Sequence, residues 1–248
     1  MDNVETPLSL DELSWIDVAA HLAREPRLIV PVGALDQHGA HLPLGTNVLI
    51  ARRMAIDLSR EFRVLRAPTV HYGVNVRSDR TFAGTAALDK KTLHRVMNEL
   101  LAGWEEHGVT EFIVLTAHRH EPHLEALASL VTRRARVRVV EIWDVDIADL
   151  LEAQPGPLHA GEAETSMMLF LYPELVRMDR ARDFELPPGE FRQYVRGALP
   201  VPPRDGTGSV GRPSAASAVK GRRIYERILA AIRDAVFLAG PARESDTL

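Results

Sequence analysis

Residues 27–50 read RLIVPVGALDQHGAHLPLGTNVLI and join three kinds of segment in a short space. The run that begins at Arg27 is short and rich in Val, Ile and Leu, which is typical of a buried strand. A loop with Pro, Gly, an acid and two histidines follows, and a helix-like run begins near Asn47. A buried strand, a loop and a helix form the repeating unit of α/β proteins with a parallel sheet. We therefore expect an α/β fold with a polar site in this loop.

The same unit recurs along the chain. Three more apolar runs that resemble buried strands begin at Phe62, Glu111 and Val137. Segments of helical period lie between the runs, at about residues 47–61, 89–107 and 121–134. The second of these segments should begin at the N-cap residue Asp89 and end at Gly108. Strand followed by helix, repeated, predicts a mostly parallel sheet with helices on both faces.

One domain over residues 1–248 is expected, because a chain of this length with 46% hydrophobic residues can build one large α/β core. A segment rich in Pro, Gly and Ser lies at about residues 185–218, and a final helix follows it. Long segments without secondary structure generally need packing partners to stay ordered. This segment is therefore expected to be an ordered loop or a subunit arm, and the protein is expected to be a homo-oligomer.

Charge and residue usage exclude several classes of function. The net charge is −4 and no long basic run is present, so the sequence predicts no binding of nucleic acid or of an anionic membrane. The chain has no cysteine, which rules out disulfides, zinc-thiolate sites and thiol catalysis. No apolar run reaches the roughly 18 residues of a membrane span, and the N-terminus shows no signal pattern. We expect a cytoplasmic protein whose partners are small molecules or short peptides.

Polar side chains follow three of the four expected strands. Asp36 and His38 follow the first run, the sequence AHRHE at residues 117–121 follows the third, and Trp143 and Asp144 close the fourth. In open parallel sheets, ligands bind beyond the carboxyl ends of the strands. We therefore expect these side chains to meet at one edge of the sheet.

Another polar cluster, with His159, Glu162 and Glu164, stands at the start of a further helix-like run. Together with the pairs Asp-x-His and His-x-His, it provides nitrogen and oxygen ligands of the kind that divalent metals prefer. The sequence therefore predicts a metal centre. The histidines that lack partners at ligand spacing are expected to be surface or structural residues: His21, His71, His94, His107 and His123.

The loop sequence resembles the signature of a known family. PVGALDQHGAHLPLGTN, residues 31–47, is similar to the signature loop of the creatininase family. Three later segments match this family in the same order: TFAGTAALDKKTL from Thr81, TAHRHE from Thr116 and HAGEAETSMMLFLYPELV from His159. The ordered matches run from about residue 10 to residue 235 and end in GTGSVGRPSAASAVKG. The resemblance implies an α/β fold, a hexamer, and a two-metal site that hydrolyses cyclic amides, formamides or peptide-like bonds.

The resemblance also implies ligands at particular positions. Asp36 stands where the family has a metal-binding Glu, His38 matches a metal-binding His, and Asn47 stands on the metal-bridging Asp. His118 matches the later metal-binding His, and Glu164 matches the Glu of the Glu-Thr-Ser motif. The resemblance thus implies five metal ligands: Asp36, His38, Asn47, His118 and Glu164.

Two further histidines receive roles from the same resemblance. His120 stands where creatininase itself has another carboxylate ligand and many relatives have Gly, and His159 matches a His implicated in proton transfer. We assign His159, Glu164 and His120 as catalytic residues, and Arg119 and Trp143 as substrate-binding residues. If Arg119 points into the pocket, it can pair with a substrate carboxylate; otherwise it points to solvent.

The departure at Asn47 changes the expected number of metal ions. Two dications about 3.5 Å apart are held by bridging anions that offset their repulsion. The carbonyl oxygen of Asn47 can ligate one ion, but a neutral amide is a poor bridge. Arg119, in place of the usual Gly, adds a positive charge, and RSDRTFAGT lacks the His that relatives often place before this motif. We expect a divalent ion, Zn or Mn with Fe as a further candidate, and one per chain rather than two.

The expected function is that of a metal-dependent amidohydrolase acting on a C–N bond of a small molecule or peptide, with an altered, mononuclear metal site. Two alternatives stay open. The first is a non-hydrolytic ring closure, dehydration or rearrangement on the same scaffold, with the metal as Lewis acid. The second is a non-catalytic homologue that binds a ligand or partner, since a shared fold does not establish chemistry.

Overall fold

The computed structural model describes residues 8–185, 187, 189–190, 193 and 208–238. The four strands are β1 (Arg27–Val32), β2 (Leu65–Arg66), β3 (Glu111–Thr116) and β4 (Arg136–Glu141). The α-helices are α1 (Trp15–Leu22), α2 (Thr46–Phe62), α3 (Lys90–Glu106), α4 (Glu121–Ala128), α5 (Glu162–Leu171) and α7 (Ala218–Ile232). The chain therefore alternates strand and helix through most of its length, as the sequence predicts.

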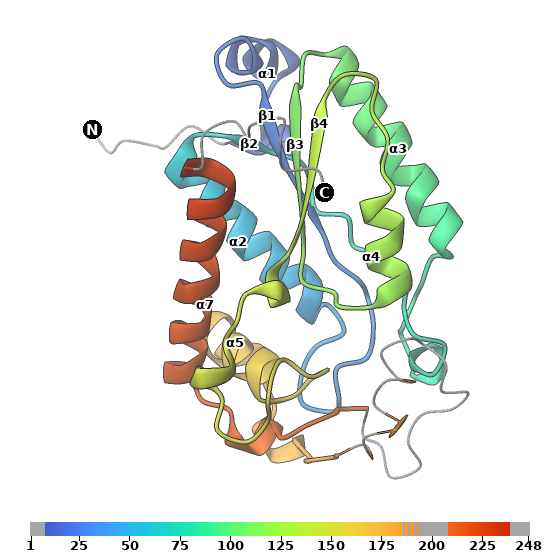
Figure 1. Ribbon diagram of the computed structural model, residues 1–248, viewed down its shortest axis with the longest axis vertical. Helices are drawn as coiled ribbons and strands as arrows, with labels where there is room; N and C mark the ends of the chain where they lie inside the picture. Colours follow the sequence, from blue (N-terminus) through green and yellow to red (C-terminus); the bar gives the residue numbers. More distant parts are fainter. Residues whose placement is uncertain (1–7, 186, 188, 191–192, 194–207, 239–248) are drawn as a thin grey trace.

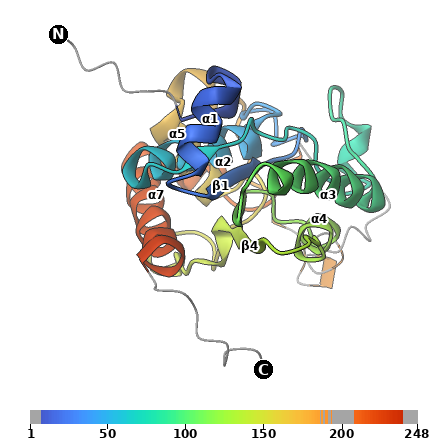
Figure 2. The ribbon, with the colours of Figure 1, turned by 90° about the horizontal axis from the view of Figure 1, so that it is seen from above.

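The strands form one parallel sheet in the order β2-β1-β3-β4. Helices α2, α5 and α7 cover one face, and α3 and α4 cover the other (Figures 1 and 2). This arrangement confirms the predicted single α/β domain with a parallel sheet flanked on both faces. No helix within the described residues is long and apolar enough to cross a bilayer.

The central strands are buried on both faces, so their side chains alternate between two cores. Leu28, Val30 and Val32 belong to the core that also contains α3, whereas Ile29 belongs to the core that contains α2, α5 and α7. Each of these four side chains is fully buried. Continuous apolar runs are what a strand covered on both faces requires. The composition of β1 thus follows directly from its central place in the sheet.

Helix boundaries agree with the sequence except at two places. The structure begins α3 after its N-cap Asp89, and Gly108 beyond its end has a φ of +101°, which Gly adopts readily. The predicted helix at 121–134 ends earlier, at Ala128. The carboxylate of Glu105 in α3 accepts backbone N–H groups from residues 133–135, and this holds the chain in a turn that leads into β4. Residues 133–135 are thus held in a turn and do not continue α4.

The second difference concerns β2. It comprises only Leu65 and Arg66, because Phe62 still belongs to α2 and Arg63 closes that helix in the left-handed conformation. The Pro-rich segment predicted at 185–218 lies largely outside the described residues, and α7 begins at Ala218 as expected.

Three strands end at the same edge of the sheet, which places the loops that follow them together. Val32 pairs with Thr116, and Thr116 pairs with Glu141, so β1, β3 and β4 finish in register. Gly33 follows β1, and a Cβ there would lie 2.7 Å from the backbone of Val48 in α2. Only glycine permits this close approach of strand and helix. The loop of residues 33–45 is thereby turned across the carboxyl edge.

Candidate metal centre

Asp36 and His38 lie in the loop that follows β1, and both side chains are fully buried. Nδ1 of His38 lies 3.1 Å from the backbone carbonyl of Asp36. A carbonyl oxygen can only accept, so Nδ1 carries the proton and Nε2 presents a lone pair. Among the described residues, Nε2 of His38 and Oδ2 of Asp36 are buried and have no hydrogen-bond partner. Both atoms are therefore available as ligands.

Glu164 reaches the same point from the first turn of α5. Its Oε2 accepts the backbone N–H of Ala160 at 2.7 Å and lies 3.6 Å from Nε2 of His38. Ala160 has a φ of +50°, a conformation that costs free energy in a residue other than glycine. Two ligands about 2.1 Å from one tetrahedral ion lie about 3.4 Å apart. His38 and Glu164 are thus at the separation that a shared metal ion requires.

Asn47, in the first turn of α2, donates through its amide nitrogen to two acceptors. Nδ2 lies 3.2 Å from Oδ1 of Asp36 and 2.9 Å from Nδ1 of His118. His118 Nε2 lies 2.9 Å from the carbonyl of Val74, so Nδ1 of this ring is an acceptor. Since both partners are acceptors, the NH₂ side of the amide must face them. The Asn47 amide therefore links Asp36 and His118 by hydrogen bonds, in the place where a second cation would otherwise bind both side chains.

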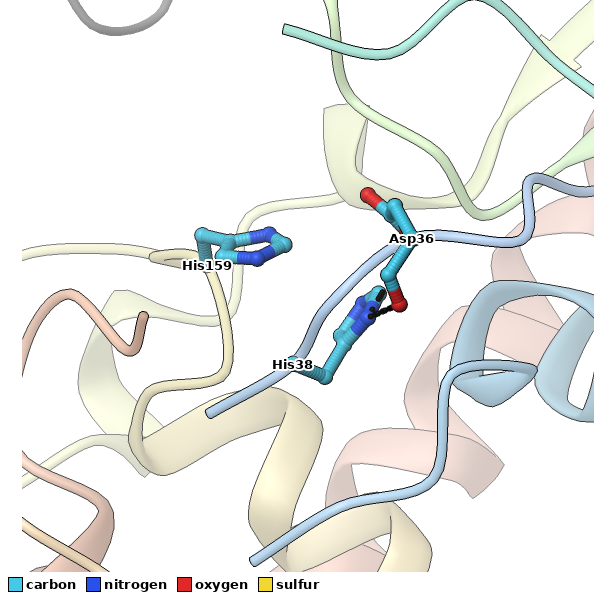
Figure 3. Close-up of side chains that lie close together, drawn as sticks. All are labelled: Asp36, His38 and His159. Atoms are coloured by element: carbon cyan, nitrogen blue, oxygen red, sulfur yellow. Dashed lines mark hydrogen bonds and ion pairs between the residues drawn. The ribbon is translucent and has the colours of Figure 1, made fainter. Parts of the chain in front are cut away.

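His159 points toward Asp36 and His38, as Figure 3 shows. The rings of His38 and His159 have centroids 4.5 Å apart, and one ligand atom from each of these three residues falls within a common 4.8 Å. Nε2 of His159 lies 2.7 Å from the backbone oxygen of Gln37 and 3.0 Å from the Gln37 side-chain nitrogen. The side-chain NH₂ group of Gln37 donates one proton to Asp79 and the other to the carbonyl of Gly208, so it has none left for His159. Nε2 of His159 is therefore the donor in its own hydrogen bond, to the backbone oxygen of Gln37.

A cavity of about 340 Å³ opens onto this cluster. Arg119 and Trp143 line it, together with the wall formed by residues 155–158. The guanidinium of Arg119 is half-exposed, lies 3.3 Å from Glu141, and donates to the carbonyl of Trp143 at 3.2 Å. The indole N–H of Trp143 is used by the carbonyl of Ala117, so the ring offers an apolar wall. Arg119 thus faces the cavity from its rim while it pairs with carboxylates.

Burial changes the protonation of the cluster. Burial, with the charges of Asp79 and Glu164, raises the pKa of Asp36 well above its usual range. Burial also raises the pKa of Glu164. The pKa of His38 is held well below its usual range by burial and by His159. A bound cation would stabilise the ionised form of such carboxyl groups and would bind the neutral form of such imidazoles.

The structure brings all the predicted site residues to one edge of the sheet. Its ligand-spaced group contains Asp36, His38 and His159, while His118 lies beside Asn47. His120 lines the cavity; its Nδ1 is bonded to the carbonyl of Val74 at 2.8 Å, and its Nε2 is buried and has no hydrogen-bond partner among the described residues. Of the histidines expected to be surface or structural, His123 is fully buried between Val74 and Thr116 and stacks edge-on against the His118 ring.

Sequence reasoning missed Asp79 and Gln37. Asp79 lines the cavity, and its side chain is buried. Its Oδ1 accepts from Gln37 at 2.8 Å, and its Oδ2 has no hydrogen-bond partner among the described residues. The position lies in the RSDRTFAGT segment, where the expected His is lacking. The absence of the expected His from this segment was the one signal in the sequence, because Asp79 is an acid that stands close to that position.

The donor set fits a divalent metal. Three buried ligand atoms without partners among the described residues, one carboxylate oxygen, one imidazole nitrogen and one amide oxygen, belong to Asp36, His38 and Asn47. Buried polar atoms in folded proteins are nearly always paired, so such a cluster calls for a ligand. Imidazole and carboxylate together suit Zn, Mn and Fe. Within the described residues, ligand atoms of Asp36, His38 and His159 come within a common 4.8 Å, and Oε2 of Glu164 lies 3.6 Å from Nε2 of His38.

Comparison with known proteins gives consistent matches. The Creatininase family model, described as creatinine amidohydrolase, matches residues 11–236. Creatinine amidohydrolase of Pseudomonas putida is 29% identical and the match covers 91% of this chain and 94% of that protein. The mycofactocin precursor peptide peptidase of Mycobacterium ulcerans (strain Agy99) is 30% identical, with 82% of each chain covered.

Solved structures agree with these sequence matches. A crystal structure of creatinine amidohydrolase (creatininase) aligns with a TM-score of 0.81 and 26% identity, covering 96% of this chain and all of that chain. A manganese form of creatininase aligns with a TM-score of 0.77 and 27% identity over 92% of this chain and 98% of that one. A Zn-Zn form of a creatininase mutant gives 0.78 and 27% over 92% and 97%.

Proposed function

Because the chain belongs to the creatininase family, whose members are metal-dependent amidohydrolases, we propose that it hydrolyses a C–N bond of a small molecule or short peptide in the cavity beyond β1 and β3. One observation carries the proposal: His38 Nε2 and Asp36 Oδ2 are buried, unpaired ligand atoms beside the carboxylate of Glu164. Within the described residues, nothing else satisfies them.

His38, Glu164 and Asp36 would hold one divalent ion, Zn or Mn by analogy with the solved creatininases. When bound, such an ion supplies Lewis acidity, which polarises a carbonyl and lowers the pKa of water. Each protein ligand is prepared for this role. His38 is fixed by its bond to the Asp36 carbonyl, and Glu164 is fixed by the backbone N–H of Ala160. Such supporting bonds orient ligands before an ion arrives.

His159 would move the proton. Its Nε2–H is held by the Gln37 carbonyl, so in the neutral ring Nδ1 is the basic nitrogen. The ring lies beside His38 on the cavity wall, where it can take a proton from the attacking water and deliver it to the leaving nitrogen. Glu164 and His120 also border the cavity and complete its polar side. Trp143 and Arg119 would contact the substrate from the opposite rim.

One ion per chain follows from Asn47. A second ion beside Asp36 and His118 would need a bridging anion, and the Asn47 NH₂ group already donates to both of those side chains. Asn47 Oδ1, buried and without a hydrogen-bond partner in the described part of the chain, would complete the coordination of the first ion. The predicted cytoplasmic homohexamer stays part of this proposal.

The test measures metal and turnover together on three variants. His38→Ala should lose both the metal and the hydrolysis of a panel of creatinine, N-formyl amino acids and dipeptides, since a lost ligand weakens binding strongly. His159→Ala should keep its metal and turn over about 10² to 10⁴ times more slowly. The control is His94→Ala, a partly buried residue of α3 that does not line the cavity, and this change should affect neither the metal nor the turnover. A full complement of metal in His38→Ala, or unchanged turnover in His159→Ala, would refute the proposed roles.

A further inference from the structure

We propose that Asp79 is a specificity-determining residue that, with His120, binds a cationic N–H group of the substrate, an ammonium or an amidinium. The inference rests on the proposed function and names the substrate class of that site. Its starting point is the side of the cavity that the metal ligands leave open. Asp79 and His120 both line this side, and both are nearly fully buried.

The two side chains present acceptors only. Asp79 uses Oδ1 to accept from Gln37, which leaves Oδ2 buried and without a hydrogen-bond partner. His120 donates Nδ1–H to the carbonyl of Val74, which leaves Nε2 as a buried lone pair. Two unpaired acceptors on one wall require a group with N–H or O–H donors. A carboxylate acceptor further favours a positively charged donor.

The charge of the cavity points the same way. Three carboxylates line it, those of Asp36, Asp79 and Glu164. Among the described residues that line it, Arg119 is the guanidinium, and it pairs with Glu141 at 3.3 Å and Asp144 at 3.9 Å. Carboxyl groups thus outnumber cations in this lining, which favours a cationic over an anionic group on the substrate.

A second metal ion is a poorer occupant of this wall. Asp79 and His120 offer two unpaired ligand atoms, Oδ2 and Nε2, whereas a divalent ion usually has three or four protein ligands. Both side chains are held in place by bonds to Gln37 and Val74. A planar amidinium or a tetrahedral ammonium can bridge more widely spaced acceptors through separate N–H bonds.

Gln37 links this wall to the reacting centre. Its side-chain nitrogen donates to Asp79, and its backbone carbonyl accepts from His159. The cationic group would therefore be held on the same loop that orients the proton-transfer histidine. This places the recognised nitrogen near the scissile bond rather than at a remote end of the substrate.

The experiment compares two matched probes, L-leucinamide and 4-methylpentanamide, which differ by one amino group. Binding to the metal-containing protein is measured by calorimetry for the wild type and for Asp79→Asn, which keeps an acceptor toward Gln37 and replaces the unpaired oxygen Oδ2 by a donor. Wild type should bind leucinamide about 10 to 100 times more tightly than the neutral amide, because hydrogen bonds to charged groups are strong. Asp79→Asn should abolish that preference and leave the affinity for the neutral amide unchanged.

The control is Asp89→Asn, at the exposed start of α3, which should preserve the preference. Equal wild-type affinity for the two probes, or no measurable binding of leucinamide, would overturn the inference without any variant. Loss of metal from Asp79→Asn would also overturn it, because Asp79 would then be a ligand. A wild type that prefers leucinamide but contains no metal and hydrolyses nothing would refute the proposed function and leave this inference standing.

Discussion

Asn47→Asp tests whether the amide replaces a second cation. In the metal-free variant, the two hydrogen bonds from Nδ2 to Asp36 and His118 are lost. Each buried hydrogen bond whose loss leaves its partner unsatisfied costs about 1–3 kcal/mol. The new carboxylate also lies beside Asp36, whose pKa burial and neighbouring carboxylates already raise. We expect the metal-free variant to be about 3–5 kcal/mol less stable than metal-free wild type.

Metal should offset much of this loss of stability in the variant. A new anionic bridge between Asp36 and His118 completes a second set of ligands, so the variant should take up a second ion. An ion present at 100 times its dissociation constant stabilises the folded state by about 2.7 kcal/mol. Urea unfolding with and without Zn, followed by the metal content per chain, measures both effects. Wild type should bind one ion, and a second equivalent of Zn should not increase its free energy of unfolding.

Two results would refute this reasoning. One is a metal-free Asn47→Asp variant as stable as wild type, because the amide bonds would then contribute nothing. The other is two tightly bound ions in wild type, because the amide would then coexist with a dinuclear site. A matched control, Asn98→Asp, changes an amide on α3 that contacts His94 and the Val131 backbone far from the centre, and it should leave the metal content unchanged.

Three further predictions concern stability and assembly. Lys220→Met leaves the fully buried Glu162 without the ammonium that pairs with it, and the free energy of unfolding should fall by about 3–5 kcal/mol in urea titrations; a loss below 1 kcal/mol would contradict this. Burial raises the pKa of Glu141 to about 7, so its ionisation opposes folding as the pH rises from about 4.5 to 7. Relative to Glu141→Gln, wild type should lose about 1–2 kcal/mol between pH 5 and pH 8, and a flat difference would refute the shift. Light scattering at micromolar concentration should give the mass of a hexamer, and a monomeric mass would contradict the predicted assembly.

The sheet could be predicted because its information is local. Apolar runs such as that of β1 identify strands buried on both faces, and the polar residues that follow them identify the edge where ligands gather. The ends of α3 were predictable from Asp89, which takes the extended N-cap conformation, and from Gly108, which has a positive φ. By contrast, α4 ends at Ala128, and Glu105 of another helix holds the backbone of residues 133–135, a contact that no local pattern reports.

The sequence could predict that several polar side chains would lie near one another, but not how their atoms are arranged. Spacing and resemblance placed Asp36, His38 and Glu164 together, but they could not show that Asn47 donates to both Asp36 and His118. That depends on which atoms of three distant segments face one another. Asp79 lies in a loop without periodicity and enters the cavity only because Gln37, 42 residues earlier, fixes its carboxylate. Tertiary structure alone therefore determines its role.

The positions of Asn47 and Asp79 are linked by electrostatics. An acid at position 47 would place its charge between two ions, whereas an acid at position 79 places its charge on the substrate side of the cavity. If the site holds one ion in place of two, less positive charge faces Asp36, Asp79 and Glu164, and the nearby Arg119 is already paired with Glu141. A neutral substrate would leave Oδ2 of Asp79 without a partner, which costs free energy that a cationic substrate would recover. The expected single ion and the proposed preference for a cationic substrate would thus have one electrostatic cause.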